Sequence, residues 1–293
     1  MRPVFPSAIQ EWRNDTYDAL DPSRPEVSMA GKKIIITGGG TGIGRATVEA
    51  FAAAKAASIF ITGRRVPPLE ETKKHVESKY GVPVHVFPAD VTDPVAMKKV
   101  ATDIGQWDVL VNNAGYFSGP ALAKDSNLEE WWKGFEINIK GTMVVWQSFH
   151  ATANRNAVFI GTATAAVLLP SALSAGNSSY LASKLGLIKF LEVLASEEQD
   201  ISVRFLHPGV IETEMTEKGG MRGKLPADRV DLPAHFTVWL ASPEAAFTAG
   251  RMVSCNWDID ALKTAKDKLP KSELFRTTLQ GFSGPDISVS LNL

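Results

Sequence analysis

The chain has 293 residues, a formal net charge of -1, 44% hydrophobic residues and 22% charged residues. These values are ordinary for a globular protein, and the length suits one large α/β domain with a substantial core. The small net charge and the lack of a long basic run argue against a protein that binds nucleic acid or an anionic membrane.

The single cysteine, Cys255, excludes an internal disulfide and a cysteine-rich metal cage, and it fits a reducing compartment. The five histidines are scattered without ligand spacing, so we expect no metal site. No apolar run approaches the ~18 residues that a membrane helix needs, and the first residues contain no apolar signal core. We therefore expect a cytoplasmic protein without a membrane segment.

The composition divides the chain into three parts. Residues 1–31 are rich in proline and polar groups but contain Phe5, Trp12 and Tyr17. Because aromatic residues are scarce in disordered segments, we expect an extension that packs on the body, with a flexible leader as the alternative. Residues 32–256 are expected to form one dinucleotide-binding domain, with a substrate loop at about 211–232. Residues 257–293 form a C-terminal extension with an amphipathic piece from Ile259 to Leu269.

A strand, a glycine-rich turn and a helix follow the first extension. The β-branched run from Lys33 to Thr37 predicts a buried strand, and the run from Arg45 to Ala54 predicts a helix. The turn between them allows close backbone approach to a pyrophosphate, which the N-terminus of the helix would face. A glycine-rich hairpin is the alternative. The residues of this turn are Gly38, Gly39, Gly40, Thr41, Gly42, Ile43 and Gly44.

The next predicted strand, Ser58 to Thr62, ends at Gly63-Arg64-Arg65. An acidic residue at the end of the second strand would bind the ribose 2′-hydroxyl of NAD, whereas arginine suits the 2′-phosphate of NADP. Since Gly63 takes the acidic position and Arg64 follows it, the sequence favours NADP(H), with NAD(H) as the alternative. Further strands are predicted at Val84 to Phe87 and Trp107 to Val111.

Tyr180 and Lys184 lie four residues apart in a predicted helix from about Ser178 to Glu197. Residues at this spacing share one helix face. A cation beside a phenol favours the phenolate and lowers its pKa, which prepares the tyrosine for proton transfer near neutral pH. By itself the spacing is also typical of an exposed pair on a solvated helix.

The motifs taken together resemble the short-chain dehydrogenase/reductase family over roughly residues 31 to 255. Three motifs carry the resemblance: Thr37-Gly38-x-x-x-Gly42-Ile43-Gly44, Asn112-Asn113-Ala114-Gly115 and Tyr180-x-x-x-Lys184. Asp90-Val91, Asn138-Ile139-Lys140-Gly141 and Pro208-Gly209-Val210-Ile211-Glu212-Thr213 agree with it. Asp21 to Pro25 and Asn256-Trp257-Asp258 look similar to fungal members. The resemblance implies a single Rossmann-type domain, with a doubly wound, mostly parallel seven-stranded sheet and helices on both faces.

The resemblance also implies roles for individual residues. Tyr180 would protonate the carbonyl oxygen as the nicotinamide hydride reaches the carbon. Lys184 would bind the nicotinamide ribose and lower the pKa of Tyr180, and Asn138 would hold a water in the proton relay. The expected cofactor contacts are Gly38, Thr41, Gly42, Ile43, Gly44, Arg64, Arg65, Asp90, Val91, Asn113, Ala114, Gly115, Tyr180, Lys184, Pro208, Gly209, Ile211 and Thr213.

The sequence departs from the family at the serine that hydrogen-bonds the substrate oxygen. Val167 stands at the usual spacing of thirteen residues before the tyrosine. An insertion in the following loop would put Thr162 in the place of the serine, and Thr164 is the alternative. Threonine keeps the hydroxyl donor and acceptor. His207 stands where the family usually has a non-catalytic residue, so we expect no catalytic role for it.

We therefore expect an NADP-dependent carbonyl reductase or alcohol dehydrogenase that acts on a small apolar substrate. The alternatives are a redox-neutral enzyme (epimerase, lyase or cyclase) and a non-catalytic dinucleotide-binding sensor. A homodimer or homotetramer is expected through the helices around Trp131 to Phe149 and Tyr180 to Leu194. The expected substrate-facing residues are Tyr116, Phe117, Leu168, Leu169, Leu173, Met215 and Met221.

Overall fold

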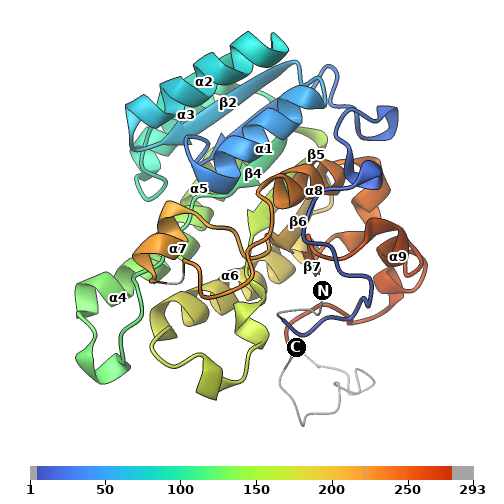
Figure 1. The fold of residues 1–293 in the computed structure, drawn as a ribbon. Coiled ribbons are helices and arrows are strands. Elements are labelled where there is room, and N and C mark those ends of the chain that lie inside the picture. The colour runs from blue at the N-terminus through green and yellow to red at the C-terminus, as the bar shows by residue number, and fades with distance from the viewer. Residues whose placement is uncertain (1–4, 221, 279–293) are drawn as a thin grey trace, which may run out of the picture.

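The computed structural model describes residues 5–220 and 222–278, so Met221 and the end of the C-terminal extension lie outside the described residues. Its centre is one seven-stranded sheet in the order β3-β2-β1-β4-β5-β6-β7 (Figure 1). Each neighbouring pair of strands runs parallel, which confirms the expected fold class. The strands are β1 (Lys33–Thr37), β2 (Ser58–Gly63), β3 (Val84–Pro88), β4 (Trp107–Asn112), β5 (Ala153–Thr162), β6 (Ile201–His207) and β7 (Met252–Ser254).

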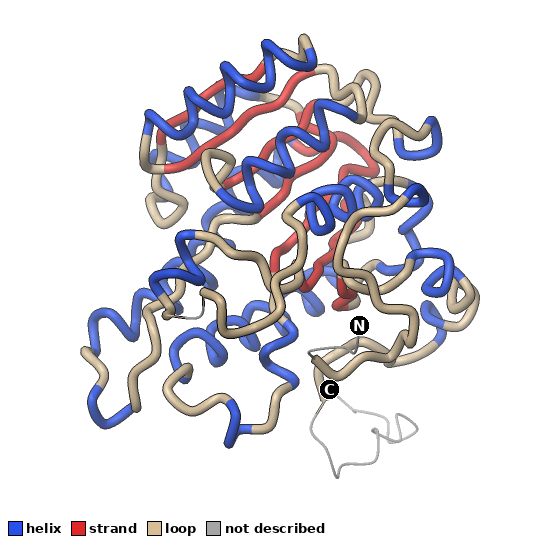
Figure 2. The backbone as a smooth tube through the Cα atoms, in the orientation of Figure 1, coloured by secondary structure: helices blue, strands red, loops and turns tan. Residues whose placement is uncertain are grey.

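Helices cover both faces of the sheet (Figure 2). The two faces carry separate apolar clusters: α1, α2 and α8 pack on one, and α3, α5 and α6 on the other. The helices are α1 (Gly42–Ala53), α2 (Val66–Tyr80), α3 (Pro94–Ile104), α4 (Leu128–Phe135), α5 (Gly141–Phe149), α6 (Ser178–Glu197), α7 (Glu214–Lys218), α8 (Asp231–Ala241) and α9 (Ile259–Lys263).

Strand β1 shows why the sequence gives this layered arrangement. Side chains alternate between the two faces of a sheet. Ile34 and Ile36 accordingly pack in the first cluster and Ile35 in the second. All three are buried. A strand covered on both faces needs apolar residues at every position, which explains the continuous run.

The chain reverses direction across the sheet between β1 and β4. After β1 it builds outward through β2 and β3, then returns and builds through β4 to β7 on the other side. In an open parallel sheet, ligands bind outside the carboxyl ends of the strands at this switch point. The fold therefore places the glycine-rich turn after β1 beside the segment that follows β4.

Residues 5–31 contact the body of the protein at several points. Leu20, Val27 and Met29 are buried in the first apolar cluster. Arg13 donates two hydrogen bonds to Asp258, at 2.7 and 3.0 Å. Trp12 forms an isolated antiparallel bridge with Trp257, so the two terminal segments lie beside each other. Among the described residues no helix is long and apolar enough to cross a membrane.

The side chain of His207, the last residue of β6, is buried without a hydrogen bond in the described structure. It is 2% exposed, and neither ring nitrogen has a partner among the described residues. Phe5 packs edge-on against the ring, with centroids 4.9 Å apart. Burial lowers the pKa of His207 to about 3, because the charged imidazolium would lose its hydration.

We predict that this histidine makes the fold sensitive to acid. Between pH about 3 and the ordinary histidine pKa of ~6.5, the unfolded chain binds a proton that the folded chain excludes. The unfolding free energy should therefore fall as the pH drops below ~6.5, with a contribution of up to about 1.4 kcal/mol per pH unit. Urea unfolding at several pH values would measure it.

His207→Phe should flatten this pH profile, and replacement of the exposed His85 by Gln should leave it unchanged. Burial also lowers the pKa of His235, so the flattening is partial. Identical pH dependence in His207→Phe and wild type would contradict the assignment.

Candidate active site

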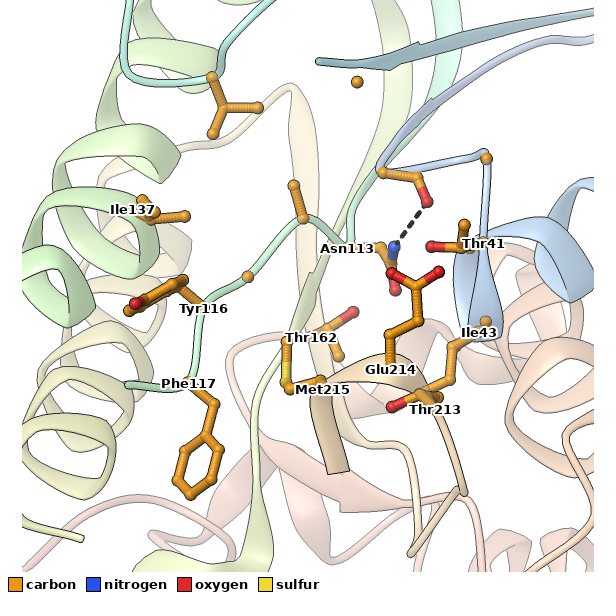
Figure 3. Close-up of a pocket in the computed structure, with 18 of the residues that line it drawn as sticks. Thr41, Ile43, Asn113, Tyr116, Phe117, Ile137, Thr162, Thr213, Glu214 and Met215 are labelled. Carbon is orange, nitrogen blue, oxygen red and sulfur yellow. Dashed lines mark hydrogen bonds between the residues drawn. The ribbon is translucent and has the colours of Figure 1, made fainter. Parts of the chain in front are cut away.

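A cavity of about 430 Å³ opens at the carboxyl ends of the strands. Figure 3 shows its two sides: Thr41 and Ile43 of the glycine-rich turn lie on one, and Tyr116, Phe117 and Ile137 on the other. Most of the expected cofactor contacts line it, namely Gly38, Thr41, Gly42, Ile43, Gly44, Arg64, Arg65, Asp90, Val91, Asn113, Ala114, Gly115, Tyr180, Lys184, Pro208 and Thr213.

The glycine-rich turn is built for close backbone approach. A Cβ atom added at Gly44 would lie 2.1 Å from the carbonyl oxygen of Gly38, so no side chain fits there. Gly42 has a φ of +52°, a conformation that favours glycine. The first turn of α1 has no acidic residue, and its N-cap Thr41 makes no capping hydrogen bond. Unpaired amides at a helix N-terminus suit a pyrophosphate, so these residues fit a dinucleotide.

The ends of β1 and β4 are joined by one hydroxyl group. Thr37 Oγ1 accepts hydrogen bonds from the backbone amides of Asn113 at 3.0 Å and Ala114 at 2.9 Å. Asn113 Nδ2 donates in return to the Thr37 carbonyl at 3.0 Å. These bonds fix the position of the Asn-Ala-Gly segment against the glycine-rich turn.

The far end of the cavity carries two guanidinium groups, beside the carboxylates of Asp90 and Glu214. Arg64 and Arg65 line it directly after β2. Asp90 lines it after β3, but one of its oxygens accepts hydrogen bonds from the amide and hydroxyl of Thr92, at 2.9 and 2.8 Å. This end therefore suits an adenosine with an anionic group on its ribose.

Tyr180 and Lys184 both line the cavity from α6, whose bounds agree with the predicted helix. The Lys184 Nζ lies 6.0 Å from the centroid of the Tyr180 ring and donates to the Thr162 carbonyl at 2.8 Å. Burial raises the pKa of Tyr180 to about 12, and hydrogen bonding to the Thr164 side chain acts against that rise. Burial also lowers the pKa of Lys184 to about 8.

The motifs imply that Lys184 lowers the pKa of Tyr180. In the structure burial is the largest influence on this pKa and raises it, and the Lys184 ammonium contacts the Thr162 carbonyl. The effect of Lys184 on the phenol stays a prediction.

The two candidate threonines lie differently relative to the cavity and to α6. Thr162 ends β5 and lines the cavity, where Figure 3 shows it between the two sides, and its carbonyl accepts from Lys184 Nζ. Thr164 is not among the residues that line the cavity. Thr164 is 6% exposed, and its hydroxyl accepts from the Ala166 amide at 3.2 Å besides interacting with Tyr180.

Asn138 is buried in a π-helical turn, Glu136–Lys140, between α4 and α5. Its Nδ2 donates to the Tyr116 carbonyl at 3.0 Å and to Ser183 Oγ at 2.9 Å. Its Oδ1 accepts from the Tyr116 amide at 2.9 Å. Asn138 thus fixes the backbone of Tyr116 against the helix that carries Tyr180. The relay water expected at this residue stays a prediction.

A lid segment, residues 211–232 without Met221, crosses the cavity. Thr213, Glu214, Met215 and Lys218 line it, and Figure 3 shows Glu214 and Met215 extending inward. A Cβ at Gly219 would lie 2.1 Å from Phe117, whose ring meets that of Tyr180 edge-on at 5.0 Å. The lid segment therefore packs on Phe117, beside Tyr180.

Comparisons with known proteins agree with this geometry. Residues 32–221 match the family model described as short chain dehydrogenase. A short chain dehydrogenase/reductase from Claviceps purpurea (strain 20.1) is 30% identical over 278 residues, which cover 93% of this chain and 94% of the relative.

Two solved structures have a fold similar to that of this chain. A short chain dehydrogenase from Burkholderia cenocepacia J2315 in complex with NADP has a TM-score of 0.68 and 26% identity, covering 77% of this chain and 96% of that one. L-sorbose reductase from Gluconobacter frateurii, complexed with NADPH and L-sorbose, has a TM-score of 0.68 and 25% identity over 78% and 96%.

The chain belongs to the short-chain dehydrogenase family. This confirms the resemblance seen in its motifs and makes the protein an NAD(P)-dependent oxidoreductase.

In this short-chain dehydrogenase two expected cofactor contacts do not line the cavity. Gly209 lies against Asp228 and Cys255, and Ile211 is 5% exposed, so both support the cavity from behind.

The expected apolar wall is correct only in part. Tyr116 and Phe117 line the cavity, but Leu168, Leu169 and Leu173 do not. Short 3-10 turns carry Leu168 and Leu173 outward, and they are 48% and 73% exposed. Met215 faces the cavity, whereas Met221 lies outside the described residues.

Sequence reasoning missed several residues that shape the site. Pro68 and Leu69 of α2 and Ile137 of the π-helical turn line the cavity. Asp228 accepts from the Val210 amide at 2.8 Å and so fixes the segment after β6. No local pattern marks these residues, because each reaches the site from another part of the chain.

Proposed function

We propose that the protein is an NADPH-dependent reductase of a small carbonyl compound. One observation carries the proposal: the Tyr180 phenol shares a cavity with the glycine-rich turn and with Lys184. A phenol in this position can donate a proton to a carbonyl oxygen that gains negative charge. NADPH, when bound, supplies the hydride.

The other polar residues position the reacting groups. Lys184 keeps a positive charge near the phenol below pH about 8, which stabilises the tyrosinate that proton donation leaves behind. Asn138 holds the Tyr116 backbone and so fixes the side of the cavity to which Tyr116 belongs. Tyr180, Lys184 and Asn138 are the expected catalytic residues of the motifs, and this geometry supports their roles.

We propose NADP(H) as the cofactor. Arg64 and Arg65 line the cavity at its adenosine end, and Gly63 puts no carboxylate there. A 2′-phosphate can accept charged hydrogen bonds from guanidinium groups, whereas the hydroxyl of NAD(H) gains less from them. The Burkholderia and Gluconobacter structures, described as complexes with NADP and NADPH, support this choice.

For the hydroxyl that orients the substrate oxygen, we propose Thr164 in place of Thr162. The Thr164 side chain interacts with the Tyr180 phenol, while Thr162 contacts α6 through its carbonyl. A second donor beside the phenol can share the developing charge on the substrate oxygen.

We propose a substrate of mainly apolar character. Phe117 and Met215 bring apolar surface to the cavity beside Tyr180.

We also propose a cytoplasmic location. It fits the single, buried Cys255, which needs no oxidising compartment.

Tyr180→Phe should lower kcat for carbonyl reduction by about 10²- to 10⁴-fold, because it removes the proton donor. NADPH binding, followed by cofactor fluorescence, should persist. Tyr80→Phe, on α2 and remote from the cavity, is the control and should keep full activity. Turnover without NADPH consumption would point to an epimerase, lyase or cyclase, and cofactor binding without any turnover would point to a sensor.

Thr164→Ala should reduce kcat by about 10²-fold, the cost of one donor to a developing oxyanion. Thr164→Ser should recover most of the rate because it restores the hydroxyl. Thr162→Ala keeps the carbonyl that binds Lys184 and should stay within a few-fold of wild type. Steady-state kinetics at saturating NADPH would measure all three. The reverse ranking would assign the role to Thr162.

We propose a homodimer or homotetramer that uses the surface of α4, α5 and α6. These helices expose large apolar side chains, which a contact between subunits would bury. They are Leu128, Trp132, Met143, Leu185 and Val193.

The variant Trp132→Glu with Leu185→Glu should be a monomer, because it places charge in an apolar contact. Light scattering after size exclusion would measure the mass. Val95→Glu, an exposed apolar position on α3, is the control. A wild-type protein that is already monomeric would refute the proposal.

A further inference from the structure

An ion pair crosses the cofactor end of the cavity. Arg65, at the end of β2, donates from Nη2 to Glu214 Oε2 at 2.8 Å. Glu214 is the first residue of α7 in the lid segment, and both side chains line the cavity. In the described part of the chain this is the one salt bridge that Arg65 makes. The carboxylate of Glu214, in the lid segment, is thus paired with the guanidinium of Arg65 at the adenosine end of the cavity.

We propose that Glu214 is a cofactor-discriminating residue, whose carboxylate competes with the 2′-phosphate of NADPH for Arg65. This inference rests on the proposed use of NADP(H). A phosphate carries more charge than a carboxylate and accepts paired hydrogen bonds from arginine, so it displaces Glu214. A 2′-hydroxyl has no such charge, and with NADH the Arg65–Glu214 pair persists.

The lid is anchored at two further points, so the exchange does not free it. At the root of α7, a Cβ on Gly42 would lie 3.1 Å from Thr213, which puts the lid against the glycine-rich turn. At the other end, Lys218 Nζ donates to the Tyr116 hydroxyl at 3.0 Å and lies over its ring at 4.5 Å. Releasing Glu214 therefore changes the charge near Arg65 more than the position of the lid.

The start of α7 also does not depend on Glu214. The Thr213 amide donates to Thr216 Oγ1 at 2.7 Å, and the two threonines form a capping box. Replacing Glu214 by Gln keeps the side-chain length and this cap, and removes only the charge. The substitution is therefore a clean probe of the competition.

The size of the effect follows from the exposure of the pair. The Arg65 and Glu214 side chains are 59% and 67% exposed. An exposed ion pair alters an equilibrium by about two- to fivefold, and salt screens it. Removing the competitor should therefore tighten NADPH binding by about this factor at low ionic strength, and by less at high ionic strength.

The test is titration of NADPH and NADH into the full chain, with dissociation constants from calorimetry. Glu214→Gln should tighten NADPH binding about two- to fivefold and leave NADH binding unchanged. Glu217→Gln is the matched control, since Glu217 lies on the same helix, is 62% exposed and pairs with Arg222 at 3.2 Å. It should change neither constant. In an Arg65→Gln background, Glu214→Gln should have no further effect.

An unchanged or weaker NADPH constant in Glu214→Gln would overturn the inference, as would equal tightening for NADH. Failure of the proposed cofactor has a different signature. In that case the wild-type protein would bind NADPH no tighter than NADH, and Arg65→Gln would alter neither constant.

Discussion

The hydroxyl of Thr37 fixes the segment after β4 to the end of β1, at the point where these two paired strands join the halves of the sheet and the chain reverses direction. It accepts two backbone amides from the segment after β4, at 3.0 and 2.9 Å. A parallel sheet leaves a crevice at this point, and its edges must be fixed before anything can bind in it. The position of the glycine-rich turn, of Asn113 and, through the 113–116 segment, of Tyr116 all depend on this contact. The shape of the proposed cofactor site thus depends on hydrogen bonds to the backbone.

Burial, more than pairing of charges, sets the protonation states around the crevice. It is the largest influence on the pKa of Tyr180, Lys184 and His207, and in each case it favours the neutral form. Burial thus shifts the pKa values of Tyr180 and Lys184, on one helix face, in opposite directions. The same effect at His207 gives no chemistry, because Phe5 covers the ring and the cavity does not include it.

The sequence predicts best where periodicity and local chemistry act together. The continuous run of Ile34, Ile35 and Ile36 predicts a buried strand, and in the structure this strand is covered on both faces. The family motifs predict Tyr180 and Lys184 on one helix face that lines the cavity.

Prediction fails where a loop decides which way a side chain points. Leu168 and Leu173 read as apolar pocket residues, but 3-10 turns expose them. Thr162 ends β5 and Thr164 lies in the turn that follows, so the path of that turn decides which hydroxyl lies near Tyr180. The Arg65–Glu214 pair joins residues 149 positions apart. Neither has a local signal in the sequence.

The terminal segments, as far as the structure describes them, cover one edge of the sheet and do not line the cavity. The last strand, β7, has only three residues and lies at an edge, where unpaired backbone groups invite association with other chains. Met252 of this strand donates to the Phe275 carbonyl at 2.9 Å, and Asn256 donates to the Arg13 carbonyl at the same distance. Residues from both ends of the chain therefore cover this edge. The region that matches the family, 32–221, contains Tyr180 and Lys184 but not this cover. The motif residues and the cover of the sheet edge are therefore encoded in different parts of the chain.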